Sequence, residues 1–300
     1  MRILGHTSVR KRLATLAHQG VIGQSYVFFG PQGVGKSLCA LEFAATLCGE
    51  ENFEPTAEKP HPFDVMILRP ETEVKRGVTK ERSLSAEQSR DGIQFLSRFP
   101  VSGRYRVLII EDAHRLSLSA QNVLLKTLEE PNPSAVILFV THEIGSLLPT
   151  ILSRVERVRF GFVPEALLRE EGASFFPTVE QALPPFFFSL GRPGILIQAS
   201  ENTESFALTQ QRLGTLFRLS TLSLKERLRL AEELALNVPE TIRLLEWWLP
   251  GLHAQGVKLV ERAKMQRFFG FLSDVEESRA ILRTTQSNAR LVLEKLFLSL

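Results

Sequence analysis

A complete phosphate-loop pattern, G-x-x-x-x-G-K-S, lies near the start of the chain and constrains the fold more than any other feature. Its residues are Gly30, Pro31, Gln32, Gly33, Val34, Gly35, Lys36 and Ser37. An apolar run at residues 26–29 precedes the pattern, and a helical periodicity at residues 37–48 follows it. A chance glycine-rich turn would lack this context, so the sequence predicts a strand–loop–helix unit of an α/β fold.

The loop residues suit the binding of nucleotide phosphates. Glycines let successive backbone N–H groups converge on phosphate oxygens, and the following helix adds its positive N-terminal end. We expect Lys36 to reach the β- and γ-phosphates and the Ser37 hydroxyl to bind Mg²⁺. The expected ligand is ATP or ADP with Mg²⁺.

Three further apolar runs predict the rest of a parallel sheet. They cover residues 64–68, 107–110 and 135–140, and amphipathic patterns at 84–96 and 119–128 lie between them. Uninterrupted apolar runs of this length are typical of strands buried on both faces. Residues 1–160 are therefore predicted to form an α/β domain with helices on both faces of the sheet.

The pattern changes after residue 160. Residues 161–202 hold short helical pieces broken by prolines and by Gly191-Arg192-Pro193-Gly194, which predicts a small helical unit. From residue 203 on, the sequence predicts only amphipathic helices, at residues 206–219, 223–236, 240–249 and 257–300. We expect three domains, at 1–160, 161–202 and 203–300.

Composition limits the partners and the compartment. The 36 basic and 33 acidic residues give a net charge of +3, too weak a bias to indicate nucleic-acid binding by itself. The longest apolar run, residues 135–140, is far shorter than the ~20 residues of a membrane-spanning helix, so no membrane association is expected. Two cysteines, Cys39 and Cys48, cannot build a disulfide framework, and the N-terminus has no secretory pattern, which predicts a cytoplasmic protein.

Glu111 and Asp112 follow the apolar run at 107–110. Acidic residues at the tip of a buried strand are costly unless they serve a ligand or cap a turn. One role is to bind the hydrated magnesium ion. The other is that Asp112 or Ser117 caps the next helix, and the two roles are compatible. The phosphate loop and this pair alone leave kinases, G proteins and many ATPases open.

Residues 107–154 narrow the choice, with the sequence VLIIEDAHRLSLSAQNVLLKTLEEPNPSAVILFVTHEIGSLLPTILSR. This segment resembles the AAA+ clamp-loader ATPases, and among them the delta-prime subunits of bacterial DNA polymerase III. LGHTSVRKRL, GQSYVFFGPQGVGKS and SNARLVLEKLFLSL are similar to the opening helix, the phosphate loop and the last helix of that family. The resemblance is detailed over residues 3–160 and looser beyond them.

The resemblance implies a RecA-like AAA+ domain, a helical lid and a helical collar that joins the subunits of a pentameric ring. The implied partners are motor subunits of gamma/tau type, the delta subunit, the sliding clamp and primer-template DNA. It also implies that this chain is a stator, which presents Arg154 of Ser153-Arg154-Val155 to a neighbour's ATP site. Thr141, alone or together with His142, matches the family's polar sensor position beside the γ-phosphate. Val155 stands where the family has a cysteine, and it can fill the same buried space.

Three departures from the family pattern bear on the subunit type. Glu111-Asp112 replaces the Asp-Glu of motor subunits, and misplacing a catalytic group by ~1 Å can cost ~100-fold in rate. Glu111 can still hold the magnesium shell, but Asp112 is too short to orient the attacking water. The lid arginine of motor subunits is replaced by Gly194, and Arg192 is assigned to a plain turn and helix start that faces elsewhere. The family's four-cysteine zinc module is reduced to Cys48 and His61, so no zinc is expected.

Two functions from different classes are the main candidates. One is a stator with little or no ATPase activity of its own, favoured by Glu111-Asp112 and Gly194. The other is a catalytically active clamp-loader ATPase of gamma type, favoured by the intact phosphate loop. A small-molecule kinase is a third and remoter class, because the helical C-terminal third argues against it.

Overall fold

The computed structural model describes residues 3–50, 53, 61–75, 78–175, 189–201, 211–256, 262–284 and 287–299. The chain forms two compact units. The first comprises Met1–Glu71, Arg82–Ser174 and Gly191–Gly194, and the second comprises Thr72–Glu81, Phe175–Leu190 and Ile195–Leu300. The expected division into three domains stays a prediction.

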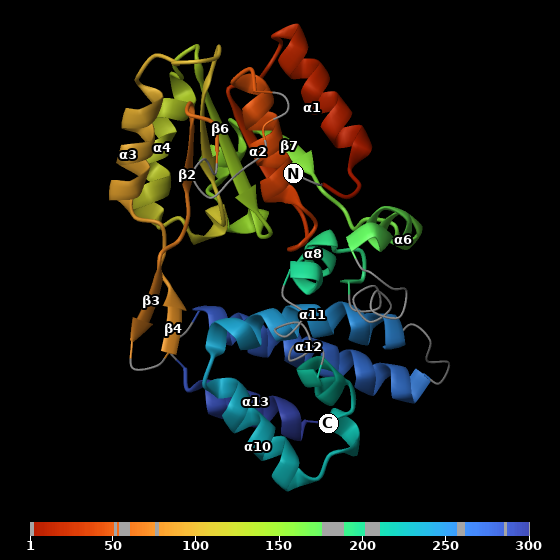
Figure 1. Cartoon of the computed structure of the whole chain (residues 1–300). Coiled ribbons are helices and arrows are strands. Elements are labelled where there is room, and N and C mark those ends of the chain that lie inside the picture. The colour runs from red at the N-terminus through yellow and green to blue at the C-terminus, as the bar shows by residue number, and fades with distance from the viewer. Residues whose placement is uncertain are drawn as a thin grey trace. The chain divides into compact units, whose positions relative to one another are not determined.

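A five-stranded parallel sheet forms the centre of the first unit (Figure 1). Its strands are β1 (Ser25–Phe29), β2 (Val65–Leu68), β5 (Arg106–Ile110), β6 (Ala135–Thr141) and β7 (Glu156–Arg159). The order is β2-β5-β6-β1-β7, and every neighbouring pair is parallel. The first four strands are the predicted apolar runs. The sequence analysis missed β7, because only Val158 of this edge strand is buried and no apolar run marks it.

Helices cover both faces of the sheet, as predicted. They are α1 (Thr7–Gln19), α2 (Lys36–Leu47), α3 (Ala86–Leu96), α4 (Leu118–Glu129) and the short α5 (Pro149–Leu152). Figure 1 shows α3 and α4 on one face and α1 and α2 on the other. Val107 and Ile109 belong to the core on the α2 face, whereas Leu108 and Ile110 belong to the core on the opposite face. This double burial explains the uninterrupted apolar run of β5.

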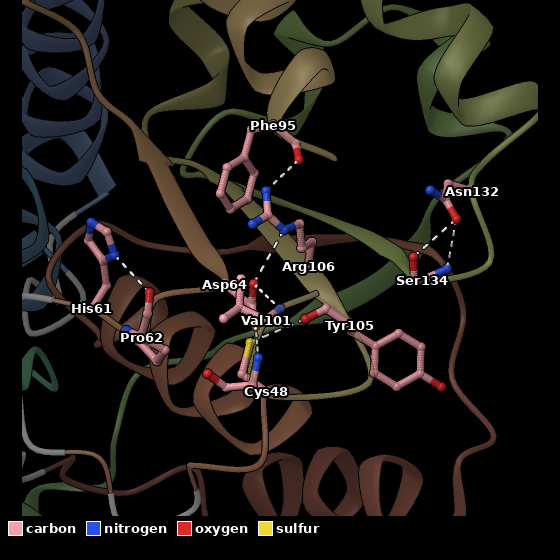
Figure 2. Close-up of polar contacts among 11 residues, drawn as sticks. Cys48, His61, Pro62, Asp64, Phe95, Val101, Tyr105, Arg106, Asn132 and Ser134 are labelled. Atoms are coloured by element: carbon pink, nitrogen blue, oxygen red, sulfur yellow. Dashed lines mark hydrogen bonds and ion pairs between the residues drawn. The ribbon is translucent and has the colours of Figure 1, made fainter. Parts of the chain in front are cut away.

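A buried ion pair ties β2 to β5 at the start of both strands (Figure 2). Nε of Arg106 lies 3.3 Å from Oδ1 of Asp64, and the two side chains are 8% and 0% exposed. The Asp64 carboxylate also accepts backbone N–H bonds from Val101 and Ser102, at 2.8 and 2.7 Å. Nη1 of Arg106 donates to the Phe95 carbonyl at 3.0 Å. These bonds compensate the burial of both charges.

The second unit is mainly helical. Its helices include α10 (Leu224–Ala235), α11 (Val238–Gly256), α12 (Arg262–Thr284) and α13 (Ala289–Leu298), and residues 211–217 are also helical. They share a core that includes the buried side chains of Leu245, Trp248 and Phe297. The predicted helix at 206–219 begins outside the described residues. Within the predicted stretch 257–300, the described residues form α12 and α13, and Asn288 caps α13 by accepting from the Arg290 N–H.

Smaller elements complete the chain. A hairpin of β3 (Thr72–Lys75) and β4 (Val78–Glu81) belongs to the second unit and was not predicted. The region expected to be a helical lid contains α6 (Glu165–Gly172) and α8 (Pro193–Glu201), while residues 176–188 lie outside the described part. Of the helices described, not one combines the length and the apolar character that a bilayer crossing requires.

Candidate functional site

The phosphate loop joins the end of β1 to the start of α2. Gly30, Gly33 and Gly35 have φ angles of 142°, 77° and 101°, a region that side chains rarely enter. A Cβ on Gly30 would lie 2.0 Å from the Phe160 carbonyl oxygen, so only glycine fits there. Gly35 is the N-cap of α2 and has no side chain with which to cap it. The first N–H groups of α2 therefore remain available to an anion at the loop.

Lys36 is the charged residue of the phosphate loop. Its side chain is 7% exposed, and Nζ donates to the carbonyl oxygens of Gly30 and Pro31 at 2.8 and 2.6 Å. Burial lowers the pKa of Lys36 to about 8; the Asp112 charge opposes this shift and the Arg192 charge adds to it. Lys36 is thus a desolvated cation held against the loop, a suitable partner for a phosphate oxygen.

Asp112 and Glu111 are adjacent in the chain but have different partners. Asp112, with φ 46° and ψ 46°, begins the short turn Ala113–Arg115, and its charge acts on Lys36. The Glu111 carboxylate accepts from Nε and Nη2 of Arg69, at 2.7 and 3.4 Å. Arg69 follows β2, which flanks β5 on the side away from β6 and β1. Glu111 is therefore paired with Arg69 beside the neighbouring strand, whereas the charge of Asp112 acts on the loop lysine.

The capping alternative for this acidic segment is also resolved. Ser117 is the N-cap of α4, and its Oγ accepts from the Ala120 N–H at 3.1 Å. Asp112 makes no side-chain capping bond to the turn that it begins. Because Ser117 supplies the cap, the carboxylate of Asp112 is not needed for it.

Thr141 is the last residue of β6 and is buried. It pairs in register with Phe29, the residue before the phosphate loop, so it stands level with the loop. Its Oγ1 accepts from the Glu143 N–H at 3.0 Å and lies 3.5 Å from Nδ1 of His114. The role of Thr141 as a polar sensor stays a prediction.

Two residues beside the loop were missed or misplaced by the sequence analysis. Nε2 of His6 donates to the carbonyl of Val34 at 2.9 Å, and burial lowers the pKa of His6. Arg192 lies in a turn before α8, as expected, but its buried side chain packs beside the loop instead of facing elsewhere. A Cβ on Gly33 would lie 3.6 Å from Cβ of Arg192. No local sequence pattern marks these tertiary contacts.

Gly194 stands where the resemblance places the lid arginine of motor subunits. Its N–H donates to the Gly33 carbonyl at 2.8 Å, which ties the turn to the loop. A Cβ on Gly194 would lie 3.0 Å from that same oxygen. A larger residue there would require the turn or the loop to shift by a few tenths of an ångström.

Arg154 lies at the amino end of β1, whereas the phosphate loop follows the carboxyl end of the same strand. The Arg154 carbonyl accepts from Oγ of Ser25, the first residue of β1, at 2.7 Å. Its Nη1 donates to the Thr150 carbonyl at 2.9 Å and to Oγ of Ser153 at 3.2 Å. Val155, which follows it, is buried in the core on the α3–α4 face, as expected.

Cys48 and His61 have separate partners in Figure 2. The Cys48 thiol donates to the Tyr105 carbonyl at 3.5 Å, and burial raises its pKa to about 12. Nδ1 of His61 lies 3.1 Å from the Pro62 carbonyl oxygen. A thiol this hard to ionise suits a core position better than a metal site. Burial likewise raises the pKa of Cys39 to about 12.

Comparison with known proteins relates this chain to subunits of DNA polymerase III. Residues 5–163 match the family model described as DNA polymerase III, delta subunit. The DNA polymerase III subunit delta' of Pseudomonas aeruginosa is 34% identical over 141 residues, which are 43% of this chain and 40% of that protein. The gamma/tau subunit of Mycobacterium tuberculosis is 31% identical over 179 residues, which are 56% of this chain and 29% of that protein. The chain thus matches less than half of the length of these relatives.

Solved structures support the fold. A DNA polymerase III gamma subunit-related protein of Thermotoga maritima has a TM-score of 0.54 at 20% identity, over 95% of this chain and 97% of that one. A RuvB variant of the same organism has a TM-score of 0.50 at 18% identity, over 84% and 88% of the two chains. The predicted α/β fold with a parallel sheet, followed by a helical region, is therefore confirmed.

Proposed function

Because the chain belongs to the DNA polymerase III delta subunit family, we propose that it is a delta-prime-like stator of a clamp loader. In this role it supplies Arg154 to the ATP site of a neighbouring motor subunit during sliding-clamp loading. Its proposed partners are the gamma/tau and delta subunits, the sliding clamp and primer-template DNA, in the cytoplasm.

The separation of Arg154 from the chain's own phosphate loop carries this proposal. The arginine is bonded at the first residue of β1, and the loop begins after the last residue of this five-residue strand. At about 3.3 Å per residue, the strand puts roughly 13 Å between the two backbone positions. The Arg154 guanidinium is also held by the Thr150 carbonyl. An arginine so placed serves a phosphate presented by another subunit better than one in its own loop.

The loop itself supports binding of ATP or ADP. The glycines, the α2 N-terminus and Lys36 provide the phosphate contacts, and Thr141 stands level with them. The hydroxyl of Ser37 is an oxygen ligand of the kind that Mg²⁺ prefers. Glu111 is a weaker candidate for the magnesium shell, because its carboxylate is already paired with Arg69.

The proposed chain binds nucleotide and hydrolyses it slowly or not at all. The Arg69–Glu111 pair diverts one of the two acids that follow β5, and Asp112 is the shorter of the two. A positioned base is needed to orient the attacking water, so turnover should suffer more than binding.

A catalytically active gamma-type ATPase is the second candidate. The complete phosphate loop and Thr141 favour it, as does the 31% identity to a gamma/tau subunit. The two candidates differ in the turnover of the isolated chain and not in the fold.

Nucleotide binding and steady-state ATPase of the purified chain test the choice. We expect saturable binding of ATP and ADP with Mg²⁺, lost in Lys36→Ala, without motor-like turnover. Turnover at the rate of a gamma/tau subunit measured in parallel would establish the second candidate instead. The control is Lys11→Ala, on an exposed residue of α1.

A further inference from the structure

Three side chains of metal-binding type meet at the carboxyl edge of the sheet, where β5 and β6 end. One ligand atom of each of Asp112, His114 and His142 lies within 4.8 Å of those of the other two. The two imidazole rings are in edge contact, with centroids 4.1 Å apart and planes at 62°. All three residues are partly buried.

The fold brings these residues together from two separate segments. β5 and β6 are parallel neighbours, so the residues that follow them emerge side by side. Asp112 takes a left-handed conformation, unusual for a residue other than glycine, and the turn that it begins carries His114. His142 directly follows Thr141, the end of β6. Sequence spacing alone does not bring His114 and His142 together.

We propose that Asp112, His114 and His142 form a binding site for a divalent transition-metal ion such as Zn²⁺, Co²⁺ or Ni²⁺. Imidazole nitrogens suit these ions, whereas Mg²⁺ and Ca²⁺ prefer oxygen ligands only. At metal–ligand bonds near ~2.1 Å, tetrahedral ligand atoms lie about 3.4 Å apart. The observed spacing therefore needs only a small closure of side chains that already converge.

Three protein ligands leave a coordination position open, which water or a phosphate oxygen can fill. The site borders the phosphate loop, since the Asp112 charge acts on Lys36 and His114 lies 3.5 Å from Oγ1 of Thr141. The expectation that this chain holds no zinc rested on missing cysteines, and this site uses none. It is also distinct from a magnesium ion held by Ser37.

Titration of the full-length, metal-free chain with Co²⁺ tests the site, followed by visible absorption and by calorimetry with Zn²⁺. The buffer holds an excess of Mg²⁺ and contains no nucleotide, so the result does not depend on the proposed clamp-loader role. We expect one Co²⁺ per chain, with ligand-field bands that Zn²⁺ abolishes and Mg²⁺ does not. His114→Ala and His142→Ala should each weaken binding by about tenfold or more. His18→Ala, on the exposed surface of α1, should leave it unchanged.

Several outcomes would overturn the site: no saturable binding, full displacement by Mg²⁺, or equal affinity in His142→Ala and His18→Ala. Thermal melting of each metal-free variant checks that the chain is folded. If His142→Ala melts early, His142→Asn replaces it, because an amide keeps a polar side chain and is a poor ligand for these ions. Retained affinity in a folded His142→Asn chain would equally contradict the proposal.

Discussion

Nη2 of Arg154 lies 2.8 Å from Oε1 of Glu129, at the end of α4. The two side chains are 35% and 51% exposed, so water screens the pair. Exposed pairs of this kind contribute roughly 0–1 kcal/mol. Glu129 thus positions the Arg154 guanidinium when no phosphate is bound. Because the ion pair is weak, a phosphate can replace Glu129 with little loss of free energy.

Glu129→Gln should therefore leave the first unit almost as stable as before. We expect the free energy of unfolding to fall by less than about 1 kcal/mol in urea denaturation, because Arg154 keeps its bond to the Thr150 carbonyl. A loss above about 2 kcal/mol would show that the pair is structural and not a screened surface contact.

Asp64 and Arg106 form the opposite case, a buried pair. Asp64→Ala should cost about 3–5 kcal/mol in the same denaturation assay, because it leaves the Arg106 charge buried and removes the acceptor of the loop N–H groups. Glu129→Gln is the matched control, since it removes an acid that pairs with an arginine at the surface. Equal losses in the two variants would contradict the distinction drawn from burial.

Lys36 should give the first unit a measurable pH dependence. Burial lowers its pKa to about 8 from the ordinary lysine value of 10.5, so between these pH values the unfolded chain binds more protons than the folded chain. The free energy of unfolding should therefore rise with pH across this window, by about 1.4 kcal/mol for each unit of pKa difference. Below pH 8 both states are protonated and this contribution is constant.

Lys36→Met provides the comparison for this pH effect. In urea denaturation at pH 7, the free energy of unfolding of Lys36→Met should be high relative to that of the unchanged chain. By pH 10 this difference in favour of the variant should be lost. A constant difference between the two chains over this range would mean that Lys36 titrates in the folded chain as it does in water.

The regular part of the fold could be predicted because its signals are local. Val107 and Ile110 lie in an apolar run that only a strand buried on both faces would need. Edge strand β7 was missed because its exposed side chains give no such run. The helix after Asp112 could be placed, but whether Asp112 or Ser117 caps it depends on backbone geometry that the pattern does not encode.

The parts of the site that a sequence pattern specifies could be predicted. The parts that depend on contacts between distant segments could not. The phosphate loop needed only its spacing and its flanking strand and helix. The pairing of Glu111 with Arg69 joins residues 42 positions apart, and nothing local indicates it. Arg192 reaches the loop because Gly194 and Gly33 bring the turn close, a contact between segments far apart in the sequence.

The most direct test of the stator account uses rings reconstituted from this chain with motor and delta subunits. Arginines supplied in trans contribute ~10³–10⁵ in rate to phosphoryl transfer, and lysine lacks the planar fork that meets two oxygens. The assays are gel filtration for assembly, DNA-stimulated ATPase and clamp loading, for Arg154→Ala and Arg154→Lys. Arg157→Ala, on the exposed edge strand β7, is the control. The account predicts intact rings in which both Arg154 variants depress hydrolysis at the adjacent motor site and slow clamp loading, while the control does not. Normal ATPase in Arg154→Ala rings, or failure of those rings to assemble, would contradict it.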